Sequence, residues 1–194
     1  MLDLIINAAI FAITFLLVVR LFRADGTWSI KHLRVALKFF TVLSNIFCAA
    51  AALLMCLFPR SHTVWVLKYV GTAAVMVTML TVFLFLAPSL GKGGLAQLLQ
   101  GSDLFMHLLT PLMALFSFCV LERRGLDFGT ALLGILSVAL YGPWYLYRIR
   151  FVPEDRRMED FYGFNRNGNW AVSFAAMLAG TFLLCMGLMA LQNL

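Results

Sequence analysis

Six long apolar runs, separated by short polar or charged segments, limit this chain to one kind of fold. Each run is long enough to cross the hydrocarbon core of a bilayer as an α-helix, which takes about 20 residues. The runs lack the alternation of barrel strands, and a helix satisfies its own backbone hydrogen bonds in lipid. The sequence therefore predicts an all-α polytopic membrane protein, a six-transmembrane-helix bundle that forms a single integral membrane domain over residues 1–194. The predicted spans are residues 2–21, 38–58, 64–87, 103–121, 128–147 and 170–191.

The composition supports this class of protein and excludes others. Hydrophobic residues make up 62% of the chain and charged residues 12%, whereas about 25% of a soluble domain is charged. The net charge of +6 would suit a nucleic-acid partner, but the charges fall between the apolar runs, where membrane loops carry them. We therefore expect the lipid bilayer and a membrane lipid or fatty acyl substrate as partners, and no nucleic acid.

The cysteines give no sign of a metal centre. All four lie inside apolar runs, and no two of them form a C-x-x-C pair. Buried, reduced thiols are typical of this placement, and the spacings of known zinc sites do not occur. The sequence therefore predicts neither a metal nor a cofactor. The cysteines are Cys48, Cys56, Cys119 and Cys185.

Lysine and arginine are distributed unevenly over the five predicted loops. The first, third and fifth loops, with their edges, hold five, one and five of them, and the second and fourth hold one and two. Because basic loops stay cytoplasmic, we expect the odd-numbered loops inside and both termini outside. Lys68, within the third run, is expected to extend toward the Arg60 side of the membrane and reach water there. Trp65, near the start of the same run, is expected to anchor at the interface.

The second run carries an unusual polar stripe. Thr41, Ser44, Asn45 and Cys48 are spaced so that a helix places all four on one face. Polar groups at membrane depth tend to face the interior of a bundle or a cavity. We therefore expect this stripe to face another span.

His107 is the histidine that suits a role inside the membrane, because it lies near the start of the fourth run. Pro111 follows four residues later and removes the N–H that would bond the His107 carbonyl, so the helix should loosen beside the imidazole. Thr110 shares the same helical face. A purely structural hydrogen bond to a neighbouring helix is the alternative role for His107.

The two polar faces should lie at similar depth. The second and fourth spans cross the membrane in the same direction. Thr41 lies about 4–5 Å past Lys38 and His107 about 6 Å past Asp103, at the helical rise per residue. Tyr141 and Trp144, near the end of the fifth run, return to the same side. The sequence thus predicts that a hydroxyl and an imidazole from different helices meet just inside the membrane.

A threonine hydroxyl becomes a useful nucleophile when a base takes its proton, and histidine is the usual base near neutral pH. A Thr41–His107 dyad would suit the hydrolysis of an ester through an acyl-enzyme. Ser44 and Asn45 are candidates to stabilise the oxyanion. Thr110, Tyr141 and Trp144 are candidates to contact the substrate. The alternative for Thr41 is a hydrogen bond to its own helix, which membrane threonines commonly form.

Two short stretches carry a resemblance to a known family. The sequence KFFTVLSN at Lys38–Asn45, followed later by HLLTP at His107–Pro111, resembles the androgen-induced and androgen-dependent membrane threonine hydrolases. The resemblance implies a six-span enzyme that cleaves fatty acid esters of hydroxy fatty acids (FAHFAs), with Thr41 as nucleophile and His107 as base. The chain is shorter than the vertebrate members and is similar to compact bacterial relatives, which implies a bacterial inner membrane.

Two other functions remain open for the same polar faces. A membrane acyltransferase would use related chemistry and needs a second acceptor site. A lipid-binding or transport protein without catalysis would use the faces as a pocket, with Lys68 or Arg148 as a charge partner for its ligand. A haem protein with two histidine ligands would need a partner for His107 at the same depth, and the sequence offers none.

Overall fold

The computed structural model describes residues 1–24 and 27–194, and over these residues the protein is an all-α membrane bundle. Six helices in this part of the chain are long and apolar enough to cross a membrane, which confirms the predicted class. Their ends differ from the predicted spans by a few residues. They are α1 (Leu2–Phe22), α3 (Phe40–Leu57), the composite helices His62–Ser89, Ser102–Leu121 and Phe128–Phe151, and α11 (Trp170–Gln192).

Each composite helix joins α-helical segments through π or 3-10 turns. The third span consists of α4 (His62–Thr81), the π turn η1 (Val82–Leu86) and α5 (Ala87–Ser89). The fourth consists of α7 (Ser102–Leu104), the π turn η2 (Phe105–Leu109), α8 (Thr110–Phe116) and the π turn η3 (Ser117–Leu121). The fifth consists of α9 (Phe128–Leu132), the 3-10 turn η4 (Leu133–Ile135), α10 (Leu136–Leu146) and the π turn η5 (Tyr147–Phe151).

Short elements fill the loops. A small antiparallel pair, β1 (Arg23–Ala24) and β2 (Thr27–Trp28), follows α1 and leads into α2 (Ile30–Ala36). Helix α6 (Gly94–Leu98) lies between the third and fourth spans. The long loop before α11 contains two 3-10 turns, η6 (Glu154–Arg156) and η7 (Arg166–Gly168).

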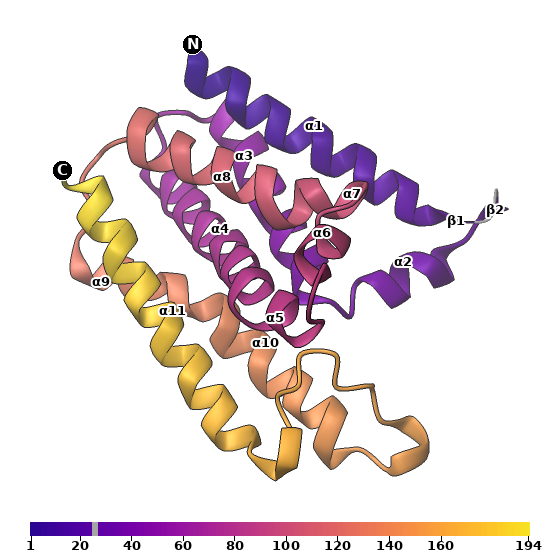
Figure 1. The fold of residues 1–194 in the computed structure, drawn as a ribbon. Helices are drawn as coiled ribbons and strands as arrows, with labels where there is room; N and C mark the ends of the chain where they lie inside the picture. The colour runs from indigo at the N-terminus through magenta and orange to yellow at the C-terminus, as the bar shows by residue number, and fades with distance from the viewer. Residues whose placement is uncertain (25–26) are drawn as a thin grey trace.

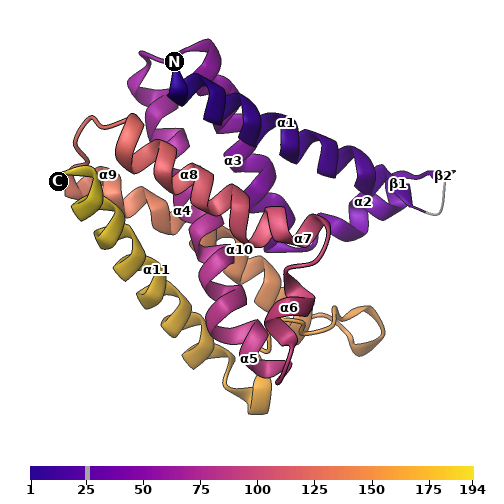
Figure 2. The same cartoon turned by 45° about the horizontal axis from the view of Figure 1, so that its top comes forward.

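Helix α4 is the central element of the bundle. Figure 1 shows it crossing the middle of the molecule, with α8 and α1 on one side and α11 on the other, and Figure 2 shows the same order with the top of the molecule tilted toward the viewer. One face of α4 packs closely on α3, because a Cβ on Gly71 would lie 3.0 Å from the Cys48 Cα. Small residues allow such close approach between membrane helices.

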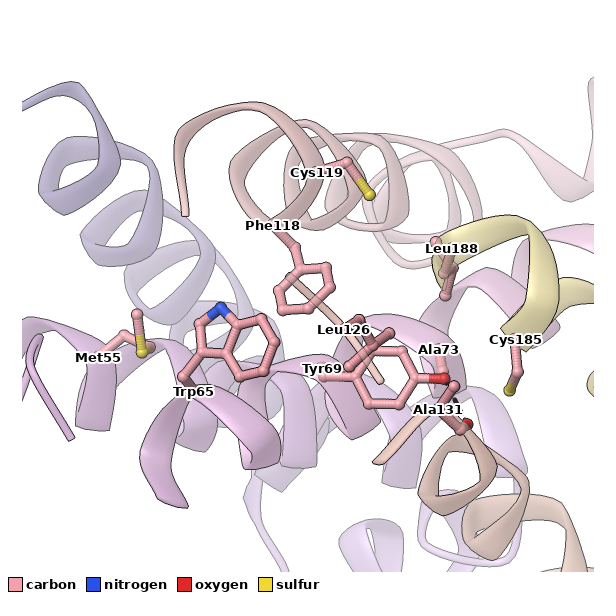
Figure 3. Close-up of a cluster of buried hydrophobic side chains, with 10 residues drawn as sticks. All are labelled: Met55, Trp65, Tyr69, Ala73, Phe118, Cys119, Leu126, Ala131, Cys185 and Leu188. Atoms are coloured by element: carbon pink, nitrogen blue, oxygen red, sulfur yellow. Dashed lines mark hydrogen bonds between the residues drawn. The ribbon is translucent and has the colours of Figure 1, made fainter. Parts of the chain in front are cut away.

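The largest apolar cluster surrounds two aromatic residues of α4 (Figure 3). Trp65 is 1% exposed and its ring contacts Phe118, while its indole N–H donates to the Glu122 carbonyl at 2.8 Å. The Tyr69 hydroxyl donates to the Ala131 carbonyl at 2.6 Å. The prediction that Trp65 anchors at the interface is therefore wrong, because other spans cover its ring and supply its acceptor.

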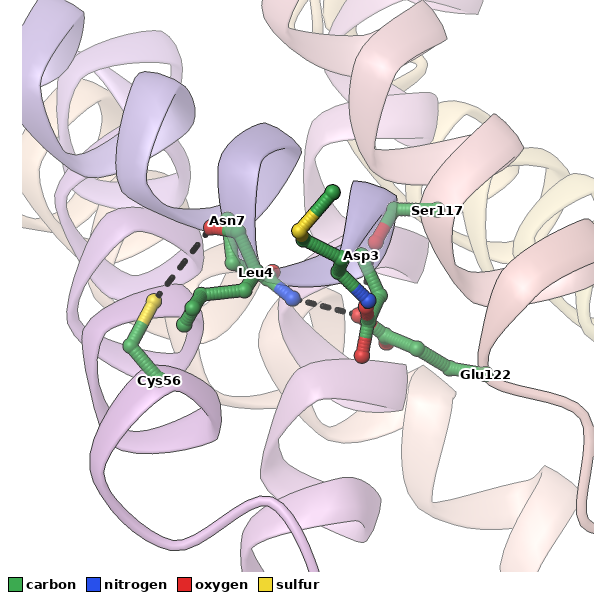
Figure 4. Close-up of polar contacts among 7 residues, drawn as sticks. Asp3, Leu4, Asn7, Cys56, Ser117 and Glu122 are labelled. Carbon is green, nitrogen blue, oxygen red and sulfur yellow. Dashed lines mark hydrogen bonds and ion pairs between the residues drawn. The ribbon is translucent and has the colours of Figure 1, made fainter.

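The prediction for Lys68 is also wrong. Its side chain is fully buried, and its ammonium group donates to Asn7 Oδ1 of α1 at 2.5 Å. Asn7 in turn donates to Glu122 Oε1 at 2.5 Å, a contact drawn in Figure 4, and Ser117 donates to the same oxygen at 2.7 Å. A lysine extends to water when no partner lies at its own depth, whereas here two other spans provide polar partners inside the bundle.

The two termini lie at the same end of the bundle, as an even number of spans requires. At this end, Cys56 Sγ lies 3.8 Å from the Leu4 carbonyl oxygen, and Asn193 donates to the Leu126 carbonyl at 2.9 Å. The start of α3 and the loop before α11 meet at the opposite end, where the Tyr141 hydroxyl reaches the Lys38 carbonyl. The second and fourth spans therefore begin at one common end of the bundle.

Candidate active site

Helix α3 begins with help from a distant part of the chain. Its N-cap residue, Phe39, has an extended backbone and no side chain that can accept a hydrogen bond. The hydroxyl of Tyr162, from the loop before α11, accepts from the Phe40 N–H at 3.1 Å and takes the place of a capping side chain. Thr41 therefore lies in a capped first turn, beside a tyrosine hydroxyl.

The polar stripe of α3 is divided between two neighbouring helices. The Asn45 amide donates to the Thr41 carbonyl at 2.8 Å and to the Met106 carbonyl of η2 at 3.1 Å. Ser44 Oγ lies 3.0 Å from the Thr41 carbonyl oxygen and 2.8 Å from Thr78 Oγ1 of α4. The side chains of Ser44 and Asn45 are buried. The stripe thus joins α3 to both α4 and the fourth span.

Pro111 explains why the Met106 carbonyl is free for this contact. The Thr110 N–H bonds the Phe105 carbonyl in the π turn. In that register the next carbonyl, that of Met106, faces Pro111, which has no N–H to give. The helix loosens beside His107 as the sequence predicted, but the carbonyl left facing the proline belongs to the residue before it.

His107 has a defined tautomer. It is 8% exposed, and its Nδ1 lies 2.8 Å from the Leu98 carbonyl oxygen. Since a carbonyl can only accept, Nδ1 carries the proton, and in the neutral ring Nε2 keeps a lone pair. This is the state that a general base requires.

Thr41 and His107 lie on neighbouring turns but do not touch through hydrogen bonds. Asn45 connects the Thr41 carbonyl with the residue before His107. Among the residues that the structure describes, no hydrogen bond joins the Thr41 hydroxyl to the imidazole; the Thr41 side chain lies instead beside the Tyr162 hydroxyl. Catalytic hydrogen bonds are often long until the substrate binds. The missing bond therefore does not test the dyad, which stays a prediction.

Thr41 lines a small apolar pocket of about 40 Å³ between α3, α4, α10 and the loop before α11. Two larger grooves adjoin it. One of about 430 Å³ runs between α4 and α11, and one of about 670 Å³ runs between α3, α4 and α10. The pocket is lined by Phe40, Thr41, Val77, Thr78, Thr81, Val82, Val138, Tyr141, Gly142, Tyr145, Tyr162, Phe164 and Met177.

The remaining candidates lie at different distances from this pocket. Tyr141 lines it and donates its proton to the Lys38 carbonyl at 2.7 Å. Trp144 lines the groove between α3 and α10 instead. Thr110 is buried at the start of α8 and is not part of the pocket lining. Tyr141 is thus the candidate from the fifth span that lies beside Thr41.

A tight turn in the loop before α11 places Tyr162 at the pocket. The carboxylate of Asp160 accepts from the Phe164 N–H at 2.9 Å, the Asn165 N–H at 2.7 Å and the Tyr145 hydroxyl at 2.8 Å. The Tyr162 N–H donates to the same Tyr145 hydroxyl at 3.2 Å. These contacts fix the turn against α10.

Sequence reasoning missed Tyr162. Its partner Phe40 is far away along the chain, and the loop has no periodic pattern that would point inward. The run of aromatic residues just before the sixth span, DFYGF at Asp160–Phe164, was the available signal. Burial raises the pKa of the Tyr162 phenol, and hydrogen bonds from the Phe40 N–H and the Thr41 hydroxyl partly offset this. The phenol therefore keeps its proton at neutral pH.

The described residues contain no group of three or more histidine, cysteine or acidic side chains placed to hold a metal ion. Fold and site together define the class: a polytopic α-helical membrane protein with a buried polar site that opens on apolar grooves. Comparison of the chain with protein families, curated proteins and solved structures finds no match.

Proposed function

We propose that the protein is an intramembrane lipid ester hydrolase that acts on long-chain acyl esters of the FAHFA kind, with Thr41 as nucleophile and His107 as base. One observation carries the proposal. The Thr41 side chain opens on an apolar pocket, while Asn45 ties its backbone to the turn that holds the His107 imidazole. The tautomer of His107, with a free lone pair on Nε2, supports the same assignment.

The chemistry follows the usual course of acyl transfer. Thr41 Oγ1 attacks the ester carbonyl carbon, and its proton passes to His107 Nε2. The tetrahedral intermediate collapses to an acyl-threonine, and the departing alkoxide takes the proton from the imidazole and leaves as an alcohol. Water, deprotonated by the same imidazole, then attacks the acyl-threonine and releases the fatty acid, which restores the Thr41 hydroxyl.

The two grooves support a branched, two-chain substrate. Both share lining residues with the Thr41 pocket, one at Thr81 and Tyr162 and the other at Phe40 and Tyr141. An ester of a hydroxy fatty acid carries one chain on its carbonyl carbon and the other chain on its alkoxy oxygen. Each chain would occupy one groove, with the ester beside Thr41.

Charge supports an orientation for the site. Thr41 lies at the end of the bundle that carries the first, third and fifth loops, where most of the lysine and arginine residues occur. Basic loops face the cytoplasm. The ester would therefore be cleaved near the cytoplasmic boundary of the membrane, which in a bacterial cell is the inner membrane.

The test is hydrolysis of a FAHFA by the purified protein in nanodiscs. We expect Thr41→Val and His107→Gln each to lower kcat by at least about 100-fold, the usual contribution of acid–base and nucleophilic groups. Thr63→Val and His62→Gln are matched controls, because both residues are exposed at the opposite end of the bundle. Full activity in folded Thr41→Val or His107→Gln protein would show that the dyad is wrong.

The same preparation separates the alternatives. A long-chain activated ester should leave an acyl group on Thr41, detected by mass spectrometry of the intact protein and its peptides. Transfer of that group to an added alcohol in preference to water would identify an acyltransferase. Stoichiometric binding of the ester without turnover or acylation would identify a lipid-binding or transport protein.

A further inference from the structure

Several hydrogen-bonding groups meet at one point on the wall of the Thr41 pocket. The Tyr162 oxygen accepts from the Phe40 N–H at 3.1 Å, and the hydroxyls of Thr41 and Tyr141 lie within hydrogen-bonding reach of it. Tyr141 donates its own proton to the Lys38 carbonyl at 2.7 Å. Toward Tyr162, Tyr141 can therefore offer only an acceptor.

The proton of Tyr162 has neutral hydroxyl oxygens as its neighbouring acceptors. Capping of α3 uses a lone pair of the Tyr162 oxygen and leaves its O–H to donate, and the Tyr141 oxygen lies within reach as an acceptor. Within the described ranges, no carbonyl or carboxylate accepts that proton. The phenol is held in its protonated form by burial, which raises its pKa. A neutral hydroxyl whose proton rests on another neutral hydroxyl oxygen can turn to a ligand oxygen that gains negative charge, because a charged acceptor forms the stronger hydrogen bond.

The donors that the sequence favoured for the oxyanion are engaged elsewhere. The Ser44 hydroxyl lies between the Thr41 carbonyl oxygen and Thr78 Oγ1, and the Asn45 amide donates to two main-chain carbonyls. A tetrahedral intermediate on Thr41 needs a donor about 2.7–3.1 Å from its oxygen. Tyr162 is the neighbour of Thr41 that has such a donor to give.

The turn around Tyr162 is built to hold that position. Asp160 accepts two backbone N–H groups and the Tyr145 hydroxyl, and Tyr145 in turn accepts the Tyr162 N–H. Gly163 closes the turn at a φ of 67°, in the left-handed region that glycine adopts without strain. The backbone of Tyr162 is therefore fixed on one side and its hydroxyl on the other, which is the preorganisation that charge stabilisation requires.

We propose that Tyr162 is a third catalytic residue, whose hydroxyl donates a hydrogen bond to the ester carbonyl oxygen as negative charge develops on it. The inference rests on the proposed hydrolase function and adds an oxyanion donor to it. As Thr41 Oγ1 bonds to the carbonyl carbon, the carbonyl π electrons move to the oxygen and the Tyr162 O–H turns to it. The Phe40 N–H, at the positive end of α3, polarises that hydroxyl from behind.

A purely structural role gives a different expectation. If Tyr162 only caps α3, its loss weakens the start of the helix and slows every substrate in the same proportion. If it donates to the carbonyl oxygen, its loss matters most for substrates whose carbonyl atom is a good acceptor. The two roles are separated by comparing an ester with its thionoester, in which sulfur, a poor hydrogen-bond acceptor, replaces the carbonyl oxygen.

The experiment measures kcat and KM for a long-chain ester and the matching thionoester with the purified protein in nanodiscs. In Tyr162→Phe we expect kcat for the ester to fall about 100-fold, the size of effect seen when one oxyanion donor is removed, with KM little changed. The ratio of ester to thionoester rates should fall about tenfold or more, because the donor favours oxygen. 3-Fluorotyrosine at position 162 retains the ring and hydroxyl, and its more acidic phenol should shift the same ratio.

The controls separate donation from loop order. Asp160→Asn and Tyr145→Phe loosen the turn and should slow both substrates without changing their ratio, and Tyr147→Phe removes an exposed hydroxyl as a matched control. An unchanged ratio in both Tyr162→Phe and the fluorotyrosine protein overturns the inference while leaving the hydrolase intact. A wild-type protein that cleaves neither substrate and gains no acyl group at Thr41 overturns the hydrolase itself, and the inference with it.

Discussion

The side-chain amide of Asn45 donates to the main-chain carbonyl of Met106 at 3.1 Å, across the contact between α3 and the fourth span. That carbonyl needs an outside donor because Pro111 has no N–H to offer in the π register. The same amide also holds the Thr41 carbonyl at 2.8 Å. One side chain thus joins the turn of the proposed nucleophile to the turn of the proposed base.

Replacement of Asn45 by leucine should separate these two turns. The volume is kept, but the Met106 carbonyl loses its donor in an apolar setting, which costs about 1–2 kcal/mol of unfolding free energy. We also expect a large loss of ester hydrolysis, because Thr41 and His107 no longer share a fixed spacing. Thermal unfolding and kcat are measured together, with Asn169→Leu, at an exposed position, as the control. Stability and activity equal to the wild type would contradict this role.

The spans could be predicted from the sequence because the length of an apolar run and the membrane thickness determine them almost alone. The inward direction of Ser44 and Asn45 was predictable for a related reason, since polar groups avoid lipid. The free carbonyl beside Pro111 was predicted one residue away from its true position, because the sequence does not reveal the π register.

The contacts of Lys68 and Tyr162 could not be predicted in this way. Lys68 is buried because Asn7 of α1 accepts its proton and is itself held by Glu122, directly after the fourth span. Tyr162 reaches Phe40 across 122 positions of the chain, through a loop without periodicity. In both cases the tertiary partner decides the environment of the side chain, and the local sequence does not contain that partner.

Gly71 should tolerate no larger side chain. A Cβ there would lie 3.0 Å from the backbone Cα of Cys48, so Gly71→Val must push α3 away from α4. We expect a loss of about 2 kcal/mol of unfolding free energy from this overpacking. Gly187→Val is the matched control, because nothing lies within 4 Å of a Cβ at that position. Equal unfolding temperatures for the two variants would show that the α3–α4 contact is not tight.

The orientation of the bundle can be tested by labelling introduced thiols. Three native cysteines are buried and Cys56 is partly exposed, so Cys56→Ala removes the accessible native thiol. In that background, Arg60→Cys should react with a membrane-impermeant maleimide in intact cells. Asp155→Cys, in the basic fifth loop, should react only after permeabilisation, because basic loops stay cytoplasmic. Both positions are exposed, so the opposite pattern would reverse the proposed orientation.

The buried charges of Lys68 and Glu122 should depend on each other. Asn7 bridges them, with 2.5 Å contacts to both, and both side chains are buried. Removing either side chain leaves a buried polar atom of Asn7 without its partner, which costs about 1–3 kcal/mol. Lys68→Met and Glu122→Gln should therefore each destabilise the protein strongly, whereas the double variant should lose at least about 1 kcal/mol less than the sum of the two. Unfolding of the four proteins in one detergent gives the coupling energy, and strict additivity would mean that the bridge through Asn7 transmits no stabilisation between the charges.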